Sequence, residues 1–321
     1  MNNIISRRTF LKGGAAAVGA VAASSVPSVA GTDQSGHIAT LYDLTKCTGC
    51  GECVSACRDE NRNKFPNPKK PFPEMIPSRV PVEDWSDKQE EDGRLTPYNW
   101  LYIQEADVET DDGDIIVYIP RRCMHCVNPP CAKLCPWGAL SQQKNGLSRI
   151  NANLCMGGAK CKNVCPWKIP QRQTGVGLYL DLLPSLAGNG VMYKCDRCYH
   201  RVNKGGTPAC VSACPEGVQT IGPRERIIED AYRIAKEING YVYGDKENGG
   251  TNTIYVSAVP FNKLSAAIEK GQGKPDLMPK KNAMASGNNI AAAMLISTFA
   301  GIVAAAGRLY FKSKKGDNDD L

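Results

Sequence analysis

The stretch "CTGCGECVSAC", residues 47–57, holds four cysteines separated by two, two and three residues. Three further groups of this kind follow, and the last cysteine of every group stands four positions after the one before it. The groups use all fifteen cysteines of the 321-residue sequence, which has only three histidines. This usage indicates thiolate ligands rather than mixed zinc sites, in which histidine is common. The groups are Cys47, Cys50, Cys53 and Cys57; Cys123, Cys126, Cys131 and Cys135; Cys155, Cys161 and Cys165; and Cys195, Cys198, Cys210 and Cys214.

The spacing inside these groups is typical of iron–sulfur ligands. Three closely spaced cysteines can each bind one iron of a cubane cluster, while the trailing cysteine ligates a second cluster, as in bacterial two-cluster ferredoxins. Disulfides are one alternative in an exported protein, but the odd number of cysteines disfavours them. Structural zinc is another, because Cys-x2-Cys pairs also hold tetrahedral zinc. Three of the groups end in Cys-Pro, at Pro136, Pro166 and Pro215, and repeated triplets with this ending fit zinc poorly.

The third group lacks one ligand. In "CMGGAKCKNVCP", residues 155–166, Gly158 stands where the second cysteine is expected, and no Asp, Glu or His lies between residues 154 and 166. A cubane iron without a protein thiolate is labile, so this site is predicted to hold a [3Fe–4S] cluster. The alternative is a [4Fe–4S] cluster with water or a distant ligand at the fourth iron. An empty site is disfavoured, because the other ligands and the proline are present.

Residues 1–30 have the features of a twin-arginine signal peptide. Arg7 and Arg8 are followed by Phe-Leu-Lys, a Gly/Ala-rich apolar stretch and the small residues "SVA" at 28–30, which together predict export and cleavage. This route carries already folded proteins, so it suits a protein whose cofactors are inserted in the cytoplasm. An amphipathic N-terminal helix with a chance Arg-Arg pair is the alternative.

Residues 286–311 are predicted to form one transmembrane helix. The stretch 290–307 is eighteen residues without a charge, and the residues up to Phe311 bring its length to the hydrocarbon thickness of a bilayer. The lysines of residues 312–321 suit a cytoplasmic tail. A buried core helix is the alternative, because alanine and glycine are frequent here. With the leader, this helix places the body, residues 31–285, on the periplasmic side of the cytoplasmic membrane.

The body is predicted to be an α+β domain. The net charge is +7, and removal of the three basic leader residues leaves +4, which is too mild to indicate nucleic-acid binding. Alternating apolar runs lead into the first three cysteine groups, and residues 100–120 are typical of a β-hairpin. Residues 223–238 have helical apolar spacing. Residues 59–97, rich in Pro, Lys and Asn, are expected to form a surface insertion.

These features resemble the four-cluster electron-transfer subunits of respiratory oxidoreductases. Members of that family are the beta subunit of membrane-bound formate dehydrogenase and the iron–sulfur subunit of the quinone-linked uptake [NiFe] hydrogenase. "LYDLTKCTGCGECVSACRDEN", "CMHCVNPPCAKLCPWGAL" and "YGDKENGGTNTIYVSAVPFNKL" are most similar to the hydrogenase subunit. The resemblance, which covers residues 38–310, implies an α+β fold of two interleaved bacterial ferredoxin-like halves with insertions, plus one C-terminal transmembrane helix.

The resemblance also implies how the cysteines share clusters. It implies three [4Fe–4S] clusters and one [3Fe–4S] cluster, with four [4Fe–4S] clusters as the alternative. Gly158 departs from the full formate-dehydrogenase pattern, but the nitrate-reductase relatives hold a [3Fe–4S] cluster with a non-cysteine residue at this position. The implied sets are Cys47, Cys50, Cys53 and Cys214; Cys195, Cys198, Cys210 and Cys57; Cys123, Cys126, Cys131 and Cys165; and Cys155, Cys161 and Cys135.

The expected function is electron transfer without catalysis. The sequence contains no nucleotide-binding loop, no activated serine or cysteine triad and no spare ligand set for nickel or molybdenum. The family implies passage of electrons between an exported catalytic subunit and a quinone-reactive integral membrane subunit. A hydrogenase partner is the leading expectation, and formate dehydrogenase or another molybdopterin oxidoreductase follows. A free-standing membrane-anchored polyferredoxin and a structural zinc or disulfide protein are the remaining alternatives.

Overall fold

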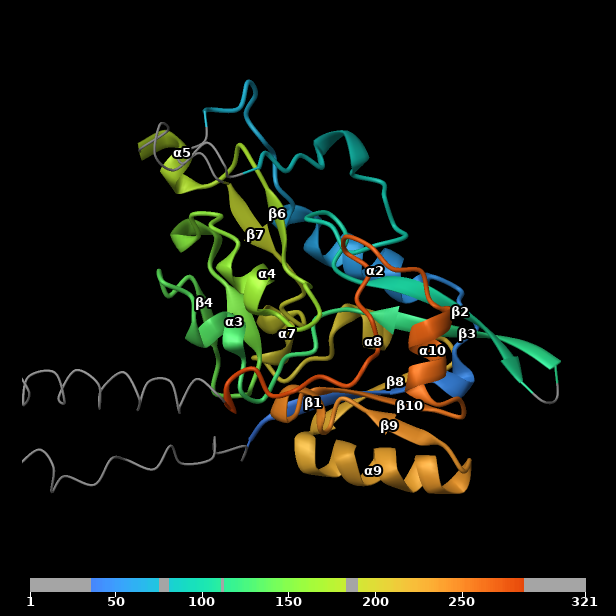
Figure 1. The fold of residues 1–321 in the computed structure, drawn as a ribbon. Coiled ribbons are helices and arrows are strands. Elements are labelled where there is room, and N and C mark those ends of the chain that lie inside the picture. The colour runs from blue at the N-terminus through green and yellow to red at the C-terminus, as the bar shows by residue number, and fades with distance from the viewer. Residues whose placement is uncertain (1–35, 75–80, 111–112, 183–189, 286–321) are drawn as a thin grey trace, which may run out of the picture. The chain divides into compact units, whose positions relative to one another are not determined.

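The computed structural model describes residues 36–74, 81–110, 113–182 and 190–285. They form an α+β body in which short strands and helices alternate with loops that carry the cysteines (Figure 1). The strands are β1 (Ile38–Asp43), β2 (Tyr102–Thr110), β3 (Gly113–Arg121), β4 (Leu140–Gln142), β5 (Ser148–Ile150), β6 (Gln171–Gln173), β7 (Val191–Tyr193), β8 (Gln219–Pro223), β9 (Tyr241–Tyr243) and β10 (Thr253–Ser257). The α-helices are α2 (Glu52–Asn61), α3 (Pro130–Lys133), α4 (Lys160–Val164), α5 (Leu178–Leu182), α7 (Tyr199–Val202), α8 (Ala209–Ser212), α9 (Arg224–Glu237) and α10 (Phe261–Ala267). Short 3-10 turns are η1 (Leu44–Lys46), η2 (Arg62–Lys64), η3 (Ser86–Lys88), η4 (Ala152–Leu154) and η5 (Glu247–Gly249).

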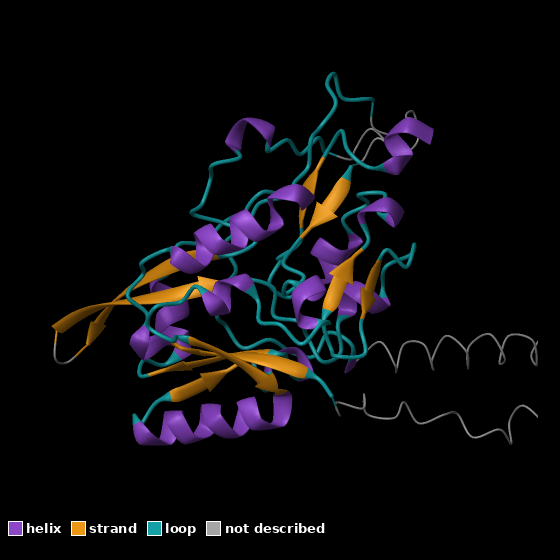
Figure 2. Ribbon diagram, turned by 180° about the vertical axis from the view of Figure 1, so that it is seen from behind, coloured by secondary structure: helices purple, strands orange, loops and turns teal. Residues whose placement is uncertain are grey.

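Four strands form a sheet in the order β8-β1-β10-β9. Its central pair, β1 and β10, is parallel, although the two strands come from opposite ends of the described chain, and the outer pairs are antiparallel. Helix α9 covers one face of this sheet (Figures 1 and 2). Its buried residues Ile227, Ala231 and Ala235 recur every four positions and therefore line one side of the helix. They pack against alternate apolar residues of the strands, including Leu41 and Ile254.

The opposite face of the sheet packs against the cysteine-bearing loops. Because side chains alternate along a strand, Tyr42 of β1 and Tyr255 of β10 point away from α9. Their rings stack with centroids 5.0 Å apart. Both tyrosines belong to the largest apolar cluster, which also contains many of the cysteines, among them Cys53, Cys57 and Cys210. The cysteines are therefore part of the core itself.

Strands β2 and β3 form the predicted hairpin. Tyr102 pairs with Arg121 at its base, and Thr110 pairs with Gly113 near its tip. The hairpin extends beyond the sheet and its helix (Figure 1), and α10 packs against β2. Residues 111–112, between the two strands, lie outside the described part of the chain.

Other predicted elements are confirmed with one difference. Strands β1, β3 and β5 precede the first three cysteine groups, and α9 occupies the predicted helical segment. The expected insertion at 59–97 starts later, because α2 continues to Asn61. It is also not wholly superficial: Trp85 and Leu95 are buried. Loop-like composition marks exposed backbone, but it does not show which isolated apolar residues anchor that backbone to the core.

The two predicted terminal segments cannot be compared with the structure. The leader at 1–30 and the transmembrane helix at 286–311 both lie outside the described residues. Among the helices that the structure does describe, none has the length and apolar character needed to cross a bilayer.

Candidate iron–sulfur cluster sites

The structure gathers the fifteen cysteines into four groups. All fifteen lie in the described residues and none forms a disulfide. We divide them into the sets that the resemblance implies, and these ligand sets, like the clusters that they would bind, stay a prediction. We call them site 1 (Cys47, Cys50, Cys53, Cys214), site 2 (Cys57, Cys195, Cys198, Cys210), site 3 (Cys123, Cys126, Cys131, Cys165) and site 4 (Cys135, Cys155, Cys161).

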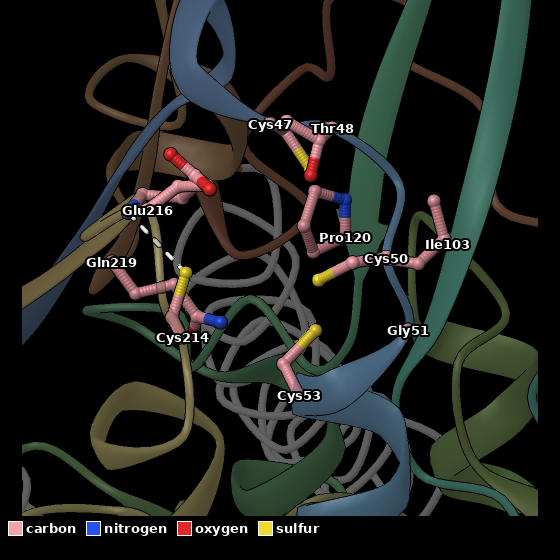
Figure 3. A pocket seen from close by; sticks show the side chains of 11 residues that line it. Cys47, Thr48, Cys50, Gly51, Cys53, Ile103, Pro120, Cys214, Glu216 and Gln219 are labelled. Atoms are coloured by element: carbon pink, nitrogen blue, oxygen red, sulfur yellow. Dashed lines mark hydrogen bonds between the residues drawn. The ribbon is translucent and has the colours of Figure 1, made fainter.

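Site 1 surrounds a small cavity. The side chains of Cys47, Cys50, Cys53 and Cys214 line it from two distant parts of the chain, and Figure 3 shows their sulfur atoms around a common space. Burial and, after it, the neighbouring thiols of Cys210, Cys47 and Cys214 raise the pKa of the Cys53 thiol to about 12. Crowded thiols of this kind disfavour several uncompensated thiolates, so a positively charged metal centre would stabilise the group.

Sites 2, 3 and 4 show the same crowding. Burial raises the pKa of the Cys57 thiol well above its usual value, and the next largest cause is the thiol of Cys195. In site 3, burial and then the neighbouring Cys165 thiol raise the pKa of Cys126. In site 4, burial and then Cys155 raise the pKa of Cys161 to about 12. Each trailing cysteine thus approaches thiols from another cysteine group, as interleaving requires.

One backbone feature is common to the four ligand loops. The residue that precedes the second ligand position has a positive φ in every loop: 73° at Gly49, 46° at His125, 67° at Gly157 and 58° at Arg197. Left-handed residues are uncommon outside glycine, so four recurrences at one loop position indicate a common loop geometry. Gly49 has a further reason to be glycine, because an added Cβ would lie 2.6 Å from the ring of Tyr118.

The loops of sites 1 and 4 correspond residue by residue. Each follows a 3-10 turn that ends at the first cysteine, Cys47 or Cys155, and the two cysteines have nearly equal φ and ψ angles, −77° and 119° against −83° and 124°. Each loop then starts a helix after a left-handed N-cap, Gly51 or Ala159. By this correspondence Gly158 occupies the place of Cys50.

Gly158 leaves space for a side chain. It is exposed, its φ lies outside the left-handed region, and a Cβ built on it meets no atom within 4 Å. Site 4 therefore lacks a fourth thiol because residue 158 is glycine, and not because the loop leaves no room for a side chain. The remaining site 4 cysteines pack with Val176, Val191 and Met192 in a separate apolar cluster.

Hydrogen-bond donors point at sulfur atoms in all four sites; at site 3 the side chain of Asn248 donates to Cys126. A donor to sulfur stabilises the thiolate and thereby raises the reduction potential of a cluster bound to it. Most of these donors are backbone amides, which are fixed by the loop conformation. The bonds at the other sites include Val218 N to Cys214 (3.4 Å), Arg197 N to Cys195 (3.3 Å), Met192 N to Cys155 (3.4 Å), Asn61 Nδ2 to Cys57 (3.8 Å) and Arg122 Nη1 to Cys210 (3.3 Å).

This donor set fits iron–sulfur clusters. The thiols are free, mostly buried, grouped in fours and a three, and met by N–H donors, and metal binding deprotonates a coordinating thiol outright. Across the described residues, no three His, Cys, Asp or Glu side chains converge closely enough to bind one metal ion. A cluster does not require such convergence, because each of its irons takes a different thiolate.

The residues that sequence reasoning missed are buried cations between the sites. Arg122 and Arg197 are at most 1% exposed, and Lys194 is also buried. Lys194 donates to the carbonyls of Ser148 (2.6 Å) and Cys195 (3.0 Å). The available signal was their position, because each stands next to a cysteine of a ligand group.

His125 is also buried beside site 3. Its Nδ1 accepts a hydrogen bond from the backbone amide of Ser148 at 3.1 Å. Burial lowers the pKa of its imidazole well below the usual value, and the nearby cations Arg197, Lys194 and Arg122 lower it further. A neutral imidazole held in this way serves to fix the loop.

Known families match the ligand loops and the leader. Residues 46–139 and residues 115–224 each match a family described as a 4Fe–4S dicluster domain. Residues 5–24 match the family described as the TAT (twin-arginine translocation) pathway signal sequence. The two dicluster matches together include every cysteine group, and the leader match supports export by the twin-arginine route.

Several characterised proteins are similar over most of the chain. The hydrogenase-2 operon protein HybA of Escherichia coli O157:H7 is 29% identical over 301 residues, which are 81% of this chain and 83% of that protein. The nitrate-inducible formate dehydrogenase iron–sulfur subunit of Escherichia coli K12 is 28% identical, with 84% and 85% covered. A probable anaerobic dimethyl sulfoxide reductase chain, YnfG, of the same strain is 30% identical, with 58% and 74% covered. The chain therefore belongs to the non-catalytic iron–sulfur electron-transfer subunits of respiratory oxidoreductases.

Proposed function

We propose that this subunit passes electrons, one at a time, between an exported hydrogenase-type catalytic subunit and a quinone-reactive membrane subunit. In this proposal, residues 1–30 are the leader, residues 31–285 the four-cluster body, residues 286–311 a membrane anchor and residues 312–321 a cytoplasmic tail. Sites 1, 2 and 3 bind [4Fe–4S] clusters through their four thiols each, and site 4 binds a [3Fe–4S] cluster through Cys135, Cys155 and Cys161. Such clusters store and release single electrons.

The observation that carries this proposal is that consecutive sites in the order 1, 2, 3 and 4 have neighbouring thiols. After the larger effect of burial, the Cys210 thiol of site 2 raises the pKa of Cys53 in site 1. In the same way Cys195 of site 2 has Cys123 of site 3 as a neighbour, and Cys161 of site 4 has Cys165 of site 3. Consecutive sites are therefore adjacent, which is the arrangement that a relay needs.

The two ends of this series reach the surface. Cys50 of site 1 is exposed, and so is Gly158 beside site 4. Around site 4 several large apolar side chains are also exposed, and Trp137, at 57%, and Leu182, at 61%, are the most exposed of them. Helix α5 packs against η4 in this region. We define the apolar patch as Leu154, Leu178 and Leu182, which lie on these two contacting elements.

The apolar patch supports a partner at site 4. An exposed apolar patch beside a functional group marks an interaction surface, and in the proposed complex the membrane subunit covers it. Replacement of Leu154 by Glu is expected to reduce co-purification of that subunit. The matched control is Met278→Glu, because Met278 is exposed to a similar degree and lies outside the patch. Equal loss with both variants would argue against docking at this patch.

Metal analysis of the detergent-solubilised complex, purified through this chain, tests the choice of catalytic partner. Nickel together with iron and acid-labile sulfide is the expected result. Molybdenum or tungsten in place of nickel would move the partner to formate dehydrogenase or another molybdopterin oxidoreductase, which the similarity to the formate dehydrogenase subunit makes the second candidate. A monomer with its full cluster content and no partner would instead favour a free-standing polyferredoxin.

The proposed anchor is tested separately. Removal of residues 286–321 is expected to release the body from washed membranes into the periplasmic fraction. Retention of the shortened chain on membranes would leave the apolar patch and its partner as the attachment, and the anchor assignment would be wrong.

A further inference from the structure

Arg122 is a buried cation in direct contact with a cysteine sulfur. It follows β3, directly before Cys123, and its side chain is 1% exposed. Its Nη1 donates to Cys210 Sγ of site 2 at 3.3 Å. The guanidinium carbon lies 5.1 Å from the ring centroid of Tyr42, over the tyrosine stack beneath the loops. Of the side-chain hydrogen bonds to cysteine sulfur in the described ranges, this is the one with a charged donor.

Among the residues with a described position, no carboxylate balances the charge of the guanidinium. No ion pair involves Arg122 in the part of the chain that the structure describes, and its Nε and Nη2 atoms are buried there without a hydrogen-bond partner. An uncompensated buried charge is strongly unfavourable. The negatively charged group that can compensate this cation is the thiolate of Cys210, which accepts the hydrogen bond from Nη1, together with the other thiolates of site 2.

We infer that Arg122 is the fixed charge partner of site 2 and raises the reduction potential of the cluster that this site binds. The inference rests on the proposed function, because it requires a cluster at site 2. One electron enters and one leaves at this site, and the charge on the guanidinium is the same in both states. A positive charge next to the cluster stabilises the more negative, reduced state. The hydrogen bond to Cys210 acts in the same direction.

Arg121 provides a matched control. It is the preceding residue, it is equally buried at 1% exposure, and its guanidinium lies over the other tyrosine of the stack, Tyr255, at 5.6 Å. Its Nη2 donates to the carbonyl oxygen of Asp276 at 2.8 Å, on a segment without cysteines. Loss of this cation removes the same volume and charge as loss of Arg122, but without a contact to sulfur.

The test is a redox titration of the purified complex followed by electron paramagnetic resonance. The variants are Arg122→Gln, Arg122→Lys and Arg121→Gln, and the site 2 signal is assigned as the one altered by Cys57→Ser. We expect Arg122→Gln to lower the midpoint potential of site 2 more than that of any other site. Arg122→Lys should lower it less, because lysine keeps the charge, and Arg121→Gln should leave it unchanged. A loaded Arg122→Gln variant with an unchanged site 2 midpoint would overturn the inference, as would an equal shift in Arg121→Gln.

Loss of the cluster is also informative. If Arg122→Gln loses four irons per chain while Arg122→Lys retains them, site 2 requires the charge and the inference stands. If both Arg122 variants and Arg121→Gln lose iron alike, the arginines have only a packing role and the inference is wrong. A wild-type complex without iron and acid-labile sulfide would be a failure of the proposed function instead.

Discussion

Gly158 occupies in the site 4 loop the position that Cys50 occupies in the site 1 loop. The residue before it, Gly157, and the residue after it, Ala159, have positive φ values of 67° and 54°, as do Gly49 and Gly51 around Cys50. The two loops therefore have the same backbone conformation but carry different numbers of cysteine ligands. A single side chain distinguishes a four-thiol site from a three-thiol site.

The first prediction concerns this position. Gly158→Cys is expected to supply the fourth thiolate, because a Cβ at residue 158 meets no atom within 4 Å. The [3Fe–4S]⁺ signal of the oxidised protein in low-temperature electron paramagnetic resonance should then disappear, and the iron content should rise by one per chain. The reduction potential of site 4 should fall, because a [4Fe–4S] cluster commonly has a lower potential than the [3Fe–4S] cluster that it replaces.

Gly158→Ala is the matched control for this substitution. It adds the Cβ without a ligand, so the signal should remain, and the exposed backbone should gain stability by about 0.4–1 kcal/mol through a less flexible unfolded state. A wild-type protein without the [3Fe–4S]⁺ signal would instead favour a [4Fe–4S] cluster with a non-thiolate ligand.

The second prediction tests the interleaved ligand sets. Cys57 follows Cys53 in the same helix α2, yet its thiol neighbours are Cys195, Cys210 and Cys198. Cys57→Ser should therefore alter the site 2 signal and leave site 1 intact. The measurement is electron paramagnetic resonance of the reduced protein together with iron content.

Cys214→Ser is its reciprocal control. Cys214 lines the cavity of site 1, so its replacement should alter site 1 and leave site 2 intact. If Cys57→Ser and Cys214→Ser changed the same signal, the two trailing cysteines would not be exchanged between the sites.

The third prediction concerns removal of iron. Cys123, Cys195 and Cys210 are buried in the main apolar cluster with Tyr42 and Tyr255, so the clusters would cross-link the core. Chelation of iron under reducing conditions should lower the near-ultraviolet circular dichroism and expose dye-binding apolar surface. Iron with sulfide should restore the signal and zinc should not. Unchanged near-ultraviolet dichroism in the iron-free protein would show that the core packs without clusters.

The fourth prediction concerns Asp84, which fixes residues 81–88 to β6. Its Oδ1 accepts hydrogen bonds from Ser86 N at 2.9 Å and Gln173 Nε2 at 2.8 Å, and Lys70 lies 2.9 Å from its Oδ2. Burial raises the pKa of this carboxyl, but the bonds from Ser86, Gln173 and Lys70 together hold it well below its usual value. The stabilisation is thus complete above the unfolded-state pKa of about 3.9 and is lost as the pH falls further.

Asp84→Asn should therefore speed hydrogen exchange in residues 81–88 at pH 7 by roughly tenfold, the equivalent of about 1.4 kcal/mol, which is near the lower end for hydrogen bonds to a charged group. The difference from the wild type should shrink below about pH 4. Asp87→Asn is the control, because that side chain is 86% exposed and its contact with Lys70 is 3.5 Å long. Equal exchange in Asp84→Asn and the wild type at pH 7 would contradict the role given to Asp84.

Much of the site could be predicted because the spacing of nearby cysteines in the sequence indicates which metal centre they can bind. The cysteine groups, the gap at Gly158 and the hairpin at 100–120 each depend on residues close together in the sequence. The assignment of the trailing cysteines to sites required the family resemblance. The local sequence does not show that the Cys57 thiol lies near Cys195 and belongs to a different site from Cys53. In the structure Cys57 lies near the thiols of Cys195, Cys210 and Cys198, and the ligand sets themselves stay a prediction.

The remainder depends on contacts that no local pattern encodes. The parallel pairing of β1 with β10 joins Leu41 to Ile254 from opposite ends of the body. Arg121 and Arg122 are adjacent and chemically identical, but only the packing decides that one meets carbonyl oxygens and the other meets sulfur. The pairing of the β8 segment "QTIGP" with β1 is likewise set by its neighbours and not by its own composition.

If the trailing cysteines are exchanged as predicted, the sequence also fixes the order in which the sites become complete during synthesis. The thiol sets are nested in the sequence, because each set that starts later ends earlier. Site 4 becomes complete at Cys161, site 3 at Cys165, site 2 at Cys210 and site 1 at Cys214. At a synthesis rate of about 5–20 residues per second, the thiol sets of sites 2 and 1 become complete a few seconds after those of sites 4 and 3. The thiol sets thus become complete in the reverse of the order in which their first cysteines leave the ribosome.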